Sequence, residues 1–320
     1  MNIHKHILAF CAALFLATGC FCSTIVFKDG DGTIIVGTYS ETGGDWSEER
    51  QVDGFMSIES EAPFNVHFIQ ADTPRVLVEG MKEFVDKVVT KVVDGKLVIS
   101  LENGKYTNLV LKVTVWAPDI REFYNTGSGD MFIDGSFNAL GDLAFHSTGS
   151  GNFNVQETFC GSLAVSSKGS GDFEAGMVNV NGNASFETSG SGDMAVKQVH
   201  VLGDLNLLST GSGDVMLAEA ACEILSAKTS GSGDFKAGKI DVIGSASFAS
   251  SGSGDIAMKR IDVLSDLKLT TSGSGDIAVT EGSCVRLSTN STGSGDITGR
   301  ISCESSSQHS TGSGDCEITQ

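Results

Sequence analysis

Hydrophobic and polar residues alternate with a period of two in short runs that fill the chain from residue 130 onward. Alternation of this kind is the signature of β-strands with one buried face, and no helical period separates the runs. In the segment 255–272 the runs give three apolar pairs: Ile256 and Met258, Ile261 and Val263, and Leu267 and Leu269. We therefore predict three short strands, joined by turns, in each repeating unit.

A tetrapeptide, Gly-Ser-Gly-Asp, separates one set of runs from the next and occurs ten times, the second time with Asn152 in place of aspartate. Successive copies begin 22, 20, 21, 21, 20, 21, 21, 20 and 19 residues apart. The first glycines are Gly127, Gly149, Gly169, Gly190, Gly211, Gly231, Gly252, Gly273, Gly293 and Gly312. A fixed period in this range predicts a repeat architecture.

The length of the repeat suits a closed coil. About 20 extended residues at about 3.3 Å each give a contour of about 65 Å, which can enclose one layer of side chains. Coils stacked about 4.8 Å apart would build a rod on the order of 45 Å long from ten motifs. We therefore predict an all-β fold, a parallel β-helix of about ten coils of 19 to 22 residues.

The motif has the chemistry of a turn. Glycine suits corners where φ is positive, and aspartate and serine side chains bond to nearby backbone N–H groups. We predict a structural ladder of turn aspartates: Asp130, Asp172, Asp193, Asp214, Asp234, Asp255, Asp276, Asp296 and Asp315. A row of ion or ligand sites is the alternative, because carboxylates about 4.8 Å apart repel by roughly 1 kcal/mol each in water. The spacing differs from that of calcium-binding nonapeptide repeats, so we expect no metal site.

A longer period of 62 residues relates the cysteines Cys160, Cys222 and Cys284, which indicates that coils were copied in blocks of three. Other coils have valine at this position, so we expect buried, apolar cysteines. Cys284 and Cys303 fall on adjacent coils, about 4.8 Å apart, and we keep a disulfide between them as a candidate. A zinc site would need clustered ligands, and no histidine accompanies these cysteines.

The N-terminus carries an export signal. An apolar run over residues 7–17 follows Lys5; it is too short to span a membrane and is typical of a signal peptide over residues 1–19. The small residues before Cys20 resemble a bacterial lipoprotein box, so we expect cleavage before Cys20 and lipid on its thiol. Ordinary secretory cleavage is the alternative, because Ala17 stands at position −3 rather than leucine. The anchor predicts a protein of the bacterial outer membrane or cell surface.

The formal net charge of −19 limits the partners. It argues against nucleic acid, whose phosphates the protein would repel. It also argues against binding an anionic bilayer by charge, so we expect membrane contact only through the lipid anchor.

The chain after the signal peptide divides into three parts. Residues 20–48 form a tether with an N-terminal hairpin, residues 49–120 a β-rich region without the motif, and residues 121–320 the repeat helix. In the β-rich region Val93-Asp94-Gly95-Lys96 indicates a hairpin turn. Residues 81–92 fit either one helical turn and a strand or two strands. Whether the β-rich region forms the first coils of the helix is left open.

The β-rich region and the repeats together resemble a known bacterial family. The segments that match are, in order, Gln51-Val-Asp-Gly-Phe-Met-Ser-Ile, Phe64-Asn-Val-His-Phe-Ile-Gln, Val76-Leu-Val-Glu-Gly, Val93-Asp-Gly-Lys-Leu-Val-Ile, Val113-Thr-Val-Trp-Ala-Pro-Asp-Ile and Thr126-Gly-Ser-Gly-Asp. Their order resembles the "putative auto-transporter adhesin, head GIN domain" family from residue 49 to the C-terminus. Gly-Ser-Gly-Asp alone would be weak evidence for this family, and the whole series of segments carries the resemblance. One departure is Ala117-Pro118, which stands where the family commonly has Tyr-Pro or a similar pair. The resemblance implies a secreted or lipid-anchored protein with a right-handed β-helix, and it carries over no catalytic residues.

These observations favour a non-enzymatic lipoprotein of the cell surface, either an adhesin or a structural module that binds a glycan or a protein. We expect no catalytic residue and no cofactor, because coils of 19 to 22 residues leave no long loops to build a cleft. One alternative is a polysaccharide-binding or polysaccharide-degrading β-helix protein. Another is an envelope scaffold whose partner is unknown.

Overall fold

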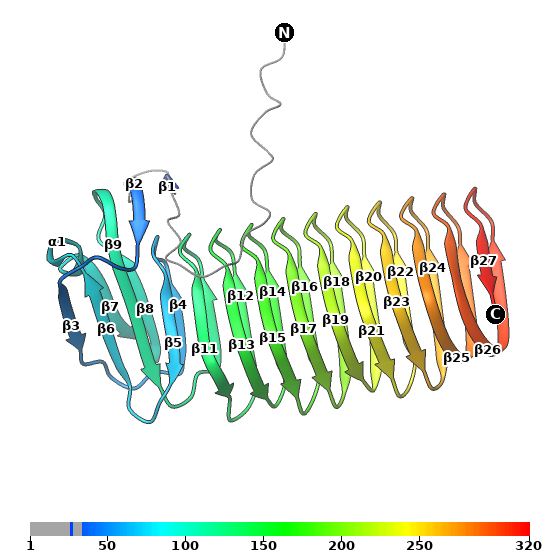
Figure 1. The fold of residues 1–320 in the computed structure, drawn as a ribbon, viewed down its shortest axis with the longest axis horizontal. Helices are drawn as coiled ribbons and strands as arrows, with labels where there is room; N and C mark the ends of the chain where they lie inside the picture. Colours follow the sequence, from blue (N-terminus) through cyan, green and yellow to red (C-terminus); the bar gives the residue numbers. More distant parts are fainter. Residues whose placement is uncertain (1–25, 28–33) are drawn as a thin grey trace, which may run out of the picture.

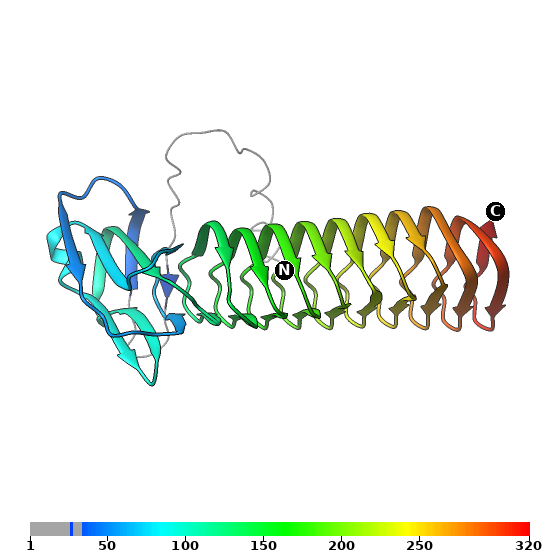
Figure 2. The same ribbon diagram turned by 90° about the horizontal axis from the view of Figure 1, so that it is seen from below.

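The alternating runs form β-strands that stack in parallel along one axis, as the sequence predicts (Figure 1). The computed structural model describes residues 26–27 and 34–320. The strands build a parallel β-solenoid of about nine turns, the number of intervals between ten motifs. A head that contains the one short helix of the described chain closes the N-terminal end, and the C-terminus lies at the far end (Figures 1 and 2).

The elements divide between the head and the solenoid. The head and its adjoining strands are β1 (Val26–Phe27), β2 (Ile34–Ser40), β3 (Trp46–Arg50), β4 (Ser57–Ser60), β5 (Val66–Gln70), β6 (Arg75–Gly80), α1 (Lys82–Val85), β7 (Val88–Val93), β8 (Lys96–Leu101) and β9 (Lys105–Ala117). The solenoid strands are β10 (Glu122–Asn125), β11 (Met131–Asn138), β12 (Leu143–Ser147), β13 (Phe153–Cys160), β14 (Leu163–Ser167), β15 (Phe173–Val180), β16 (Ala184–Thr188), β17 (Met194–Val201), β18 (Asp204–Ser209), β19 (Val215–Cys222), β20 (Ile224–Thr229), β21 (Phe235–Val242), β22 (Ala246–Ser250), β23 (Ile256–Val263), β24 (Asp266–Thr271), β25 (Ile277–Ser291), β26 (Ile297–Ser310) and β27 (Cys316–Thr319).

The coils from β11 to β24 carry the three apolar pairs expected from the sequence on two strands rather than the predicted three, and β25 and β26 are each one continuous strand. In β13 the side chains alternate between core and surface at both ends, but Gln156 and Glu157 both lie outside the core. The strand turns a corner at these two residues, so its halves lie on different sides of the coil. β14 supplies the third side, with Leu163 and Val165 buried. The apolar period of the sequence is therefore the inward-facing side of a three-sided coil.

Equivalent residues stack directly on one another because adjacent coils pair in parallel without a shift. Phe153 pairs with Phe173, and Phe173 with Met194. Near the head, Phe123 and Phe145 stack with ring centroids 5.2 Å apart and planes 8° apart. The buried side chains form one continuous hydrophobic core along the rod.

The motif glycines are needed for close stacking, not for unusual backbone angles. No motif glycine has the positive φ that a tight corner would have suggested. Instead, a Cβ atom on the first glycine of any motif from Gly149 to Gly312 would lie 1.8–2.0 Å from the carbonyl oxygen of the glycine one coil earlier. The intervening serine donates its backbone N–H to that same carbonyl, for example Ser170 to Gly149 at 3.1 Å. The coils approach too closely at this corner for any side chain.

The β-rich region does form the first layers of the stack, in an order that differs from the sequence. β4 and β5 pair in parallel with β10 and β11, and so make the coil beneath the first motif. β8 and β9 pair in parallel with the opposite edges of β4 and β5. The chain therefore builds one coil, adds a layer on its outer side, and then returns to continue in the other direction.

Antiparallel strands cap this outer layer. β6 pairs with β9, β3 with β6, and β7 with β8. The β7–β8 hairpin turns at Asp94 and Gly95, which both have positive φ, as the sequence predicts. Residues 81–92 resolve into one helical turn, α1, and strand β7. The cap covers strand edges that would otherwise be open to pairing with another chain.

The C-terminal coil is less well covered. β27 pairs only with Ile297–Arg300 of β26, so the rest of β26 has a partner on one side. There Ser306 and Gln308 replace the inward-facing Leu287 and Thr289 of the coil before, and both are exposed. Polar residues at the end of the core suit an end layer of a repeat protein.

Replacing Gly211 with alanine should destabilise the rod strongly. The new Cβ would lie 2.0 Å from the Gly190 carbonyl oxygen, so two coils must separate, which we expect to cost at least about 2 kcal/mol. Gly141→Ala is the matched control, because nothing lies within 4 Å of its Cβ position. Urea denaturation followed by circular dichroism measures both variants. Equal stability of the two would contradict the packing role of the motif.

Candidate functional site

The predicted turn aspartates lie in one row along the solenoid and bond to one another through the backbone. The Oδ1 atom of each accepts the backbone N–H of the next, for example Asp193 from Asp214 at 2.8 Å. The bonded N–H groups, at 2.8–2.9 Å, belong to Asn152, Asp172, Asp193, Asp214, Asp234, Asp255, Asp276, Asp296 and Asp315. Each carboxylate thus satisfies a backbone donor on the next coil that no strand pairing reaches.

This bonding favours the turn role of the row over an ion site. Asn152, the one amide in the series, takes the same place and accepts the Asp172 N–H at 2.8 Å, so no second carboxylate oxygen is needed. Burial and the neighbouring charges of Asp172 and Asp214 raise the pKa of Asp193, although the N–H of Asp214 opposes them. Within residues 26–27 and 34–320, no group of three or more metal-ligating side chains is found.

The row begins in the head, at Asn65, which does not belong to a Gly-Ser-Gly-Asp motif. Asn65 Oδ1 accepts the backbone N–H of Asp130 at 2.9 Å, just as the later aspartates do for their neighbours. Asn65 also donates its side-chain amide to Glu41. The available signal was its position, since Asn65 stands directly before strand β5 as each motif aspartate stands before its own strand.

A short segment, residues 41–45, links β2 to β3 and crosses the head; we call it the strap. Its N-terminal end and the residue before it, Tyr39, are held by partly buried polar contacts. The Tyr39 hydroxyl donates to the Leu111 carbonyl at 3.1 Å and accepts the Asn65 N–H at 2.9 Å. Glu41 accepts from His67 Nε2 at 3.2 Å. The strap is therefore fixed to β9 and to the first coil.

His67 joins the strap to the solenoid through two carboxylates. Its Nδ1 atom lies 2.8 Å from Asp134 Oδ2, and its ring stacks on Phe132 at 4.7 Å. Burial alone would lower the pKa of His67, but the hydrogen bonds to Asp134 and Glu41 raise it to about 9. Burial would likewise raise the pKa of Glu41, yet the hydrogen bonds from His67 and Asn65 hold it below its usual range. The raised pKa of His67 favours the imidazolium form of its ring at neutral pH.

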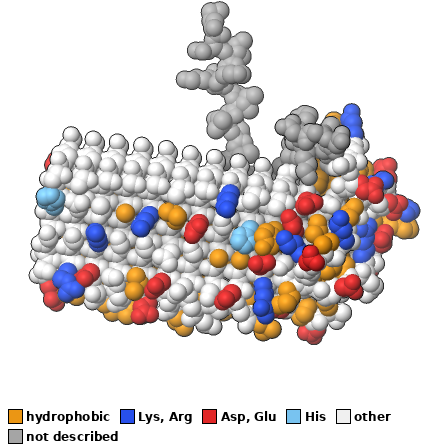
Figure 3. Space-filling view, turned by 180° about the vertical axis from the view of Figure 1, so that it is seen from behind, with side chains coloured by type: hydrophobic (Ala, Val, Ile, Leu, Met, Phe, Trp, Pro, Cys, Tyr) orange, Lys and Arg blue, Asp and Glu red, His pale blue; other side chains and the backbone are white. Residues whose placement is uncertain are grey.

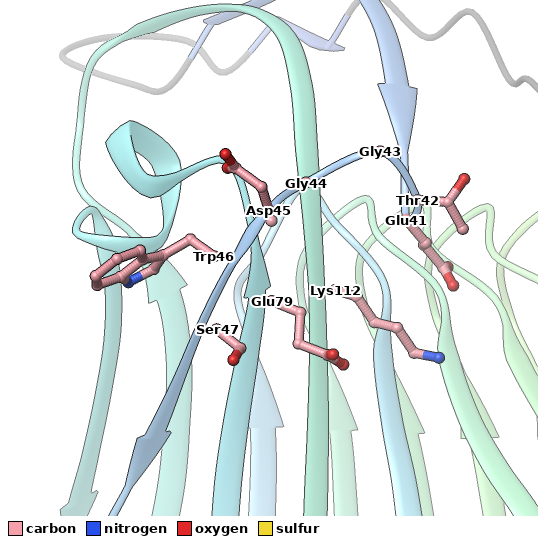
Figure 4. Close-up of a pocket in the computed structure, with 10 residues that line it drawn as sticks. Glu41, Thr42, Gly43, Gly44, Asp45, Trp46, Ser47, Glu79 and Lys112 are labelled. Atoms are coloured by element: carbon pink, nitrogen blue, oxygen red, sulfur yellow. The ribbon is translucent and has the colours of Figure 1, made fainter.

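The strap forms one wall of a polar pocket of about 540 Å³ (Figure 4). The opposite wall carries Ser47, Glu79 and Lys112, which are register partners on the adjacent antiparallel strands β3, β6 and β9. Register partners project from the same face of a sheet, so the three side chains form a row. In Figure 4 Glu79 and Lys112 extend toward Glu41, whereas Trp46 projects away from them. We call this hollow the strap pocket.

A second hollow, of about 590 Å³, lies on a corner of the solenoid. Its floor contains Gly176 and Met177, and its polar walls include Gln156, Lys197 and Glu219. The copy of these coils 62 residues later has Lys239 in place of Met177. We call this hollow the corner groove.

Charged side chains concentrate at the head. On the face shown in Figure 3, red and blue side chains gather over the head, while most of the solenoid surface is backbone and uncharged polar side chains. Another polar cluster lies at the border of the head and the solenoid. There the rings of Tyr124 and His146 stack with centroids 4.8 Å apart, and the Lys96 ammonium lies 3.9 Å from the centre of the Tyr124 ring.

The sequence profile of the family "Putative auto-transporter adhesin, head GIN domain" matches residues 54–234 and 177–281, more than two thirds of the 320 residues. The chain belongs to this family. No curated protein matches the chain.

Several crystal structures resemble this head GIN domain protein. An adhesin-like protein from Parabacteroides distasonis aligns with a TM-score of 0.51 and 16% identity, covering 88% of this chain and 99% of the other. A "putative adhesin" from Parabacteroides merdae aligns at 0.49 and 16% identity, covering 90% and 100%. A "Putative lipid binding protein" from P. distasonis aligns at 0.43 and 19% identity, covering 90% and 100%. At these identities the likeness concerns the fold alone.

The candidate disulfide falls at the C-terminal end of the solenoid. Cys284 and Cys303 are register partners on β25 and β26, and both thiols are free in the structure. Burial raises the pKa of Cys284 to about 11, so the thiolate that begins disulfide exchange is scarce at neutral pH. The bridge stays a prediction. Cys160 and Cys222, three coils apart, are buried and free, and Cys20 lies outside the described residues.

Replacing His67 should show that its bonds to the strap and the solenoid stabilise the protein in a pH-dependent way. The pKa of His67 is about 9 in the folded protein and about 6.5 when unfolded, so its contribution is full below pH 6.5 and is lost as pH rises through 9. We expect His67→Asn to lower the free energy of unfolding at pH 6 by on the order of 2 kcal/mol, allowing for solvent screening. The deficit should shrink toward pH 10.

His146→Asn is the control for this measurement, because His146 stacks on Tyr124 and burial lowers its pKa. Its effect on the free energy of unfolding should not diminish between pH 6.5 and 9. Chemical denaturation of both variants and the parent protein at several pH values gives the comparison. A His67→Asn deficit that is constant from pH 6 to 10 would contradict the charged cluster.

Proposed function

We propose that this head GIN domain protein is a non-enzymatic surface module of the bacterial cell envelope, which binds a glycan or a protein outside the cell. Membership of an adhesin-like family supports an exported or cell-surface role. The proposal extends this to a lipoprotein, held by Cys20, that presents its solenoid and head to the exterior.

The observation that carries a binding role is the uniformity of the coils. Turns of nearly equal length join the solenoid strands, and no inserted loop rises from the described coils to enclose a substrate. The rod therefore offers long, shallow, regular faces, and the head adds a polar pocket. Surfaces of this kind suit recognition of an extended or repetitive partner better than the enclosed, water-excluding site that most enzymes need.

A polysaccharide hydrolase is the enzymatic alternative, and the strap pocket contains three carboxylates, Glu41, Asp45 and Glu79. A glycosidase needs one carboxyl group that stays protonated at working pH to act as general acid. The carboxylate of Glu41 instead has a lowered pKa because His67 and Asn65 bond to it. Glu41 is therefore poorly suited to act as the general acid. A scaffold that joins other envelope proteins is the remaining alternative, and a pull-down would find its partner.

The proposal of a lipid anchor rests on the sequence around Cys20. The N-terminal part of the chain would join the folded protein at the head. Within residues 20–48, strand β2 joins the fold by pairing in parallel with β9. Among the described residues no helix is long and apolar enough to cross a membrane. A lipid on Cys20 would hold the head near the membrane.

Cys20→Ala should release the protein from the membrane. We expect the parent protein to incorporate labelled palmitate and sediment with membranes, because acyl chains insert in the bilayer. The variant should do neither. Cys22→Ala, two residues away, should behave as the parent does. Protease treatment of intact cells then tests surface exposure. Membrane retention of unlabelled Cys20→Ala protein would overturn the anchor, and complete protection of the parent would overturn the surface location.

A further inference from the structure

We propose that the strap pocket binds an uncharged sugar unit of a glycan through two neighbouring hydroxyl groups. This proposal adds a site and a ligand class to the proposed surface function. Its biological role depends on that function, but the binding can be tested without it. Binding itself needs neither the lipid anchor nor the cell.

The pocket holds a hydrogen-bond donor, Lys112, and an acceptor, Glu79, side by side. Glu79 and Lys112 are register partners on β6 and β9, so their Cβ atoms are neighbours on one face. Within the described part of the chain neither side chain forms a direct ion pair or a side-chain hydrogen bond, although the charge of Lys112 acts on Glu41 and helps to lower its pKa. Both are half-buried, and in Figure 4 both lie along the pocket. Their hydrogen-bonding capacity is therefore available to a ligand.

Adjacent hydroxyl groups of a pyranose match this pair. A hydroxyl both donates and accepts, a carboxylate only accepts, and an ammonium only donates. One sugar hydroxyl can donate to Glu79 while the next accepts from Lys112, and both bonds are of the stronger, charge-assisted kind. Ser47 on β3 extends the row by a hydroxyl beside Glu79. The pocket volume of about 540 Å³ lies within the usual range of small-molecule sites, about 300–1,000 Å³.

The charges in the pocket select against acidic sugars. Glu41, Asp45 and Glu79 line it together with one cation, Lys112. The whole chain carries a net charge of −19. A uronate or sialate carboxylate would meet more negative than positive charge, and such repulsion discriminates between ligands. A neutral glycan meets no such penalty.

The wall formed by the strap is fixed before any ligand arrives. Glu41 bonds to Asn65 and His67 at one end of the strap. In its middle Gly44 lies against Gly80, where a Cβ atom would be 2.2 Å from the Gly80 carbonyl carbon. A pocket with fixed walls loses little conformational freedom on binding, which favours affinity.

The test uses the purified mature protein with Cys20→Ala, applied to a printed array of neutral and acidic oligosaccharides. We expect saturable binding to neutral glycans and weaker binding to acidic ones. The neutral glycan that binds best is then titrated by calorimetry against variants. Lys112→Met and Glu79→Ala should each weaken binding at least about tenfold, the equivalent of one charge-assisted hydrogen bond.

Lys197→Met, in the corner groove, is the matched control and should bind as the parent does. Circular dichroism and thermal unfolding confirm that all variants fold. The proposal is overturned if no neutral glycan binds, if acidic glycans bind better, or if Lys197→Met removes binding while Lys112→Met does not. Surface exposure of the lipidated protein in cells is measured separately, so failure of this site leaves the surface function standing.

Discussion

The structure depends on how closely adjacent coils approach at the Gly-Ser-Gly-Asp corner. A Cβ atom at either glycine of the motifs from Gly149 onward would lie 1.8–2.1 Å from a carbonyl oxygen of the preceding coil, far inside van der Waals contact. The spacing of one backbone from the next is thereby set, and it allows each serine N–H to reach the glycine carbonyl one coil earlier. It also places each aspartate Oδ1 within 2.8–2.9 Å of the next aspartate N–H. Register at one corner then fixes register on all three sides, because a slip would move apolar residues out of the core.

The same constraint shapes what the protein can do. Coils locked at one spacing cannot open a deep cleft between them, so recognition falls to side chains on the faces and to the head, where antiparallel strands replace the stack. Asn65 carries the aspartate row into the head, and Glu41 and His67 attach the strap to it. The walls of the strap pocket are therefore continuous with the most regular part of the rod. This continuity is why a site in the head can be rigid although a linker forms one of its walls.

The sequence predicts the features that arise from local pattern and misses those that arise from contacts between distant segments. Period-two alternation determines the three inward sides of each coil, and the need for positive φ at Asp94 and Gly95 determines the β7–β8 hairpin. The prediction that the motif glycines serve corners with positive φ was wrong. Their role is close packing against the previous coil, which exists only once coils stack. The strap cluster could not be predicted: Glu41, His67 and Asp134 come from three separate segments, and nothing in their spacing pairs them. The reversed order of the head layers likewise follows from tertiary packing alone.

Hydrogen exchange at the aspartates of the motif tests this account most directly. Their N–H groups lie in turns outside the strands, and turns on a protein surface usually exchange quickly. Here each N–H of Asp172 to Asp315 in the row is bonded to a side chain of the previous coil. We expect these amides to be protected to the same degree as those of the adjoining strands, measured by NMR or by mass spectrometry with single-residue resolution. Exchange at the rate of an unstructured turn, with the strands protected, would show that the corner does not hold the coils together.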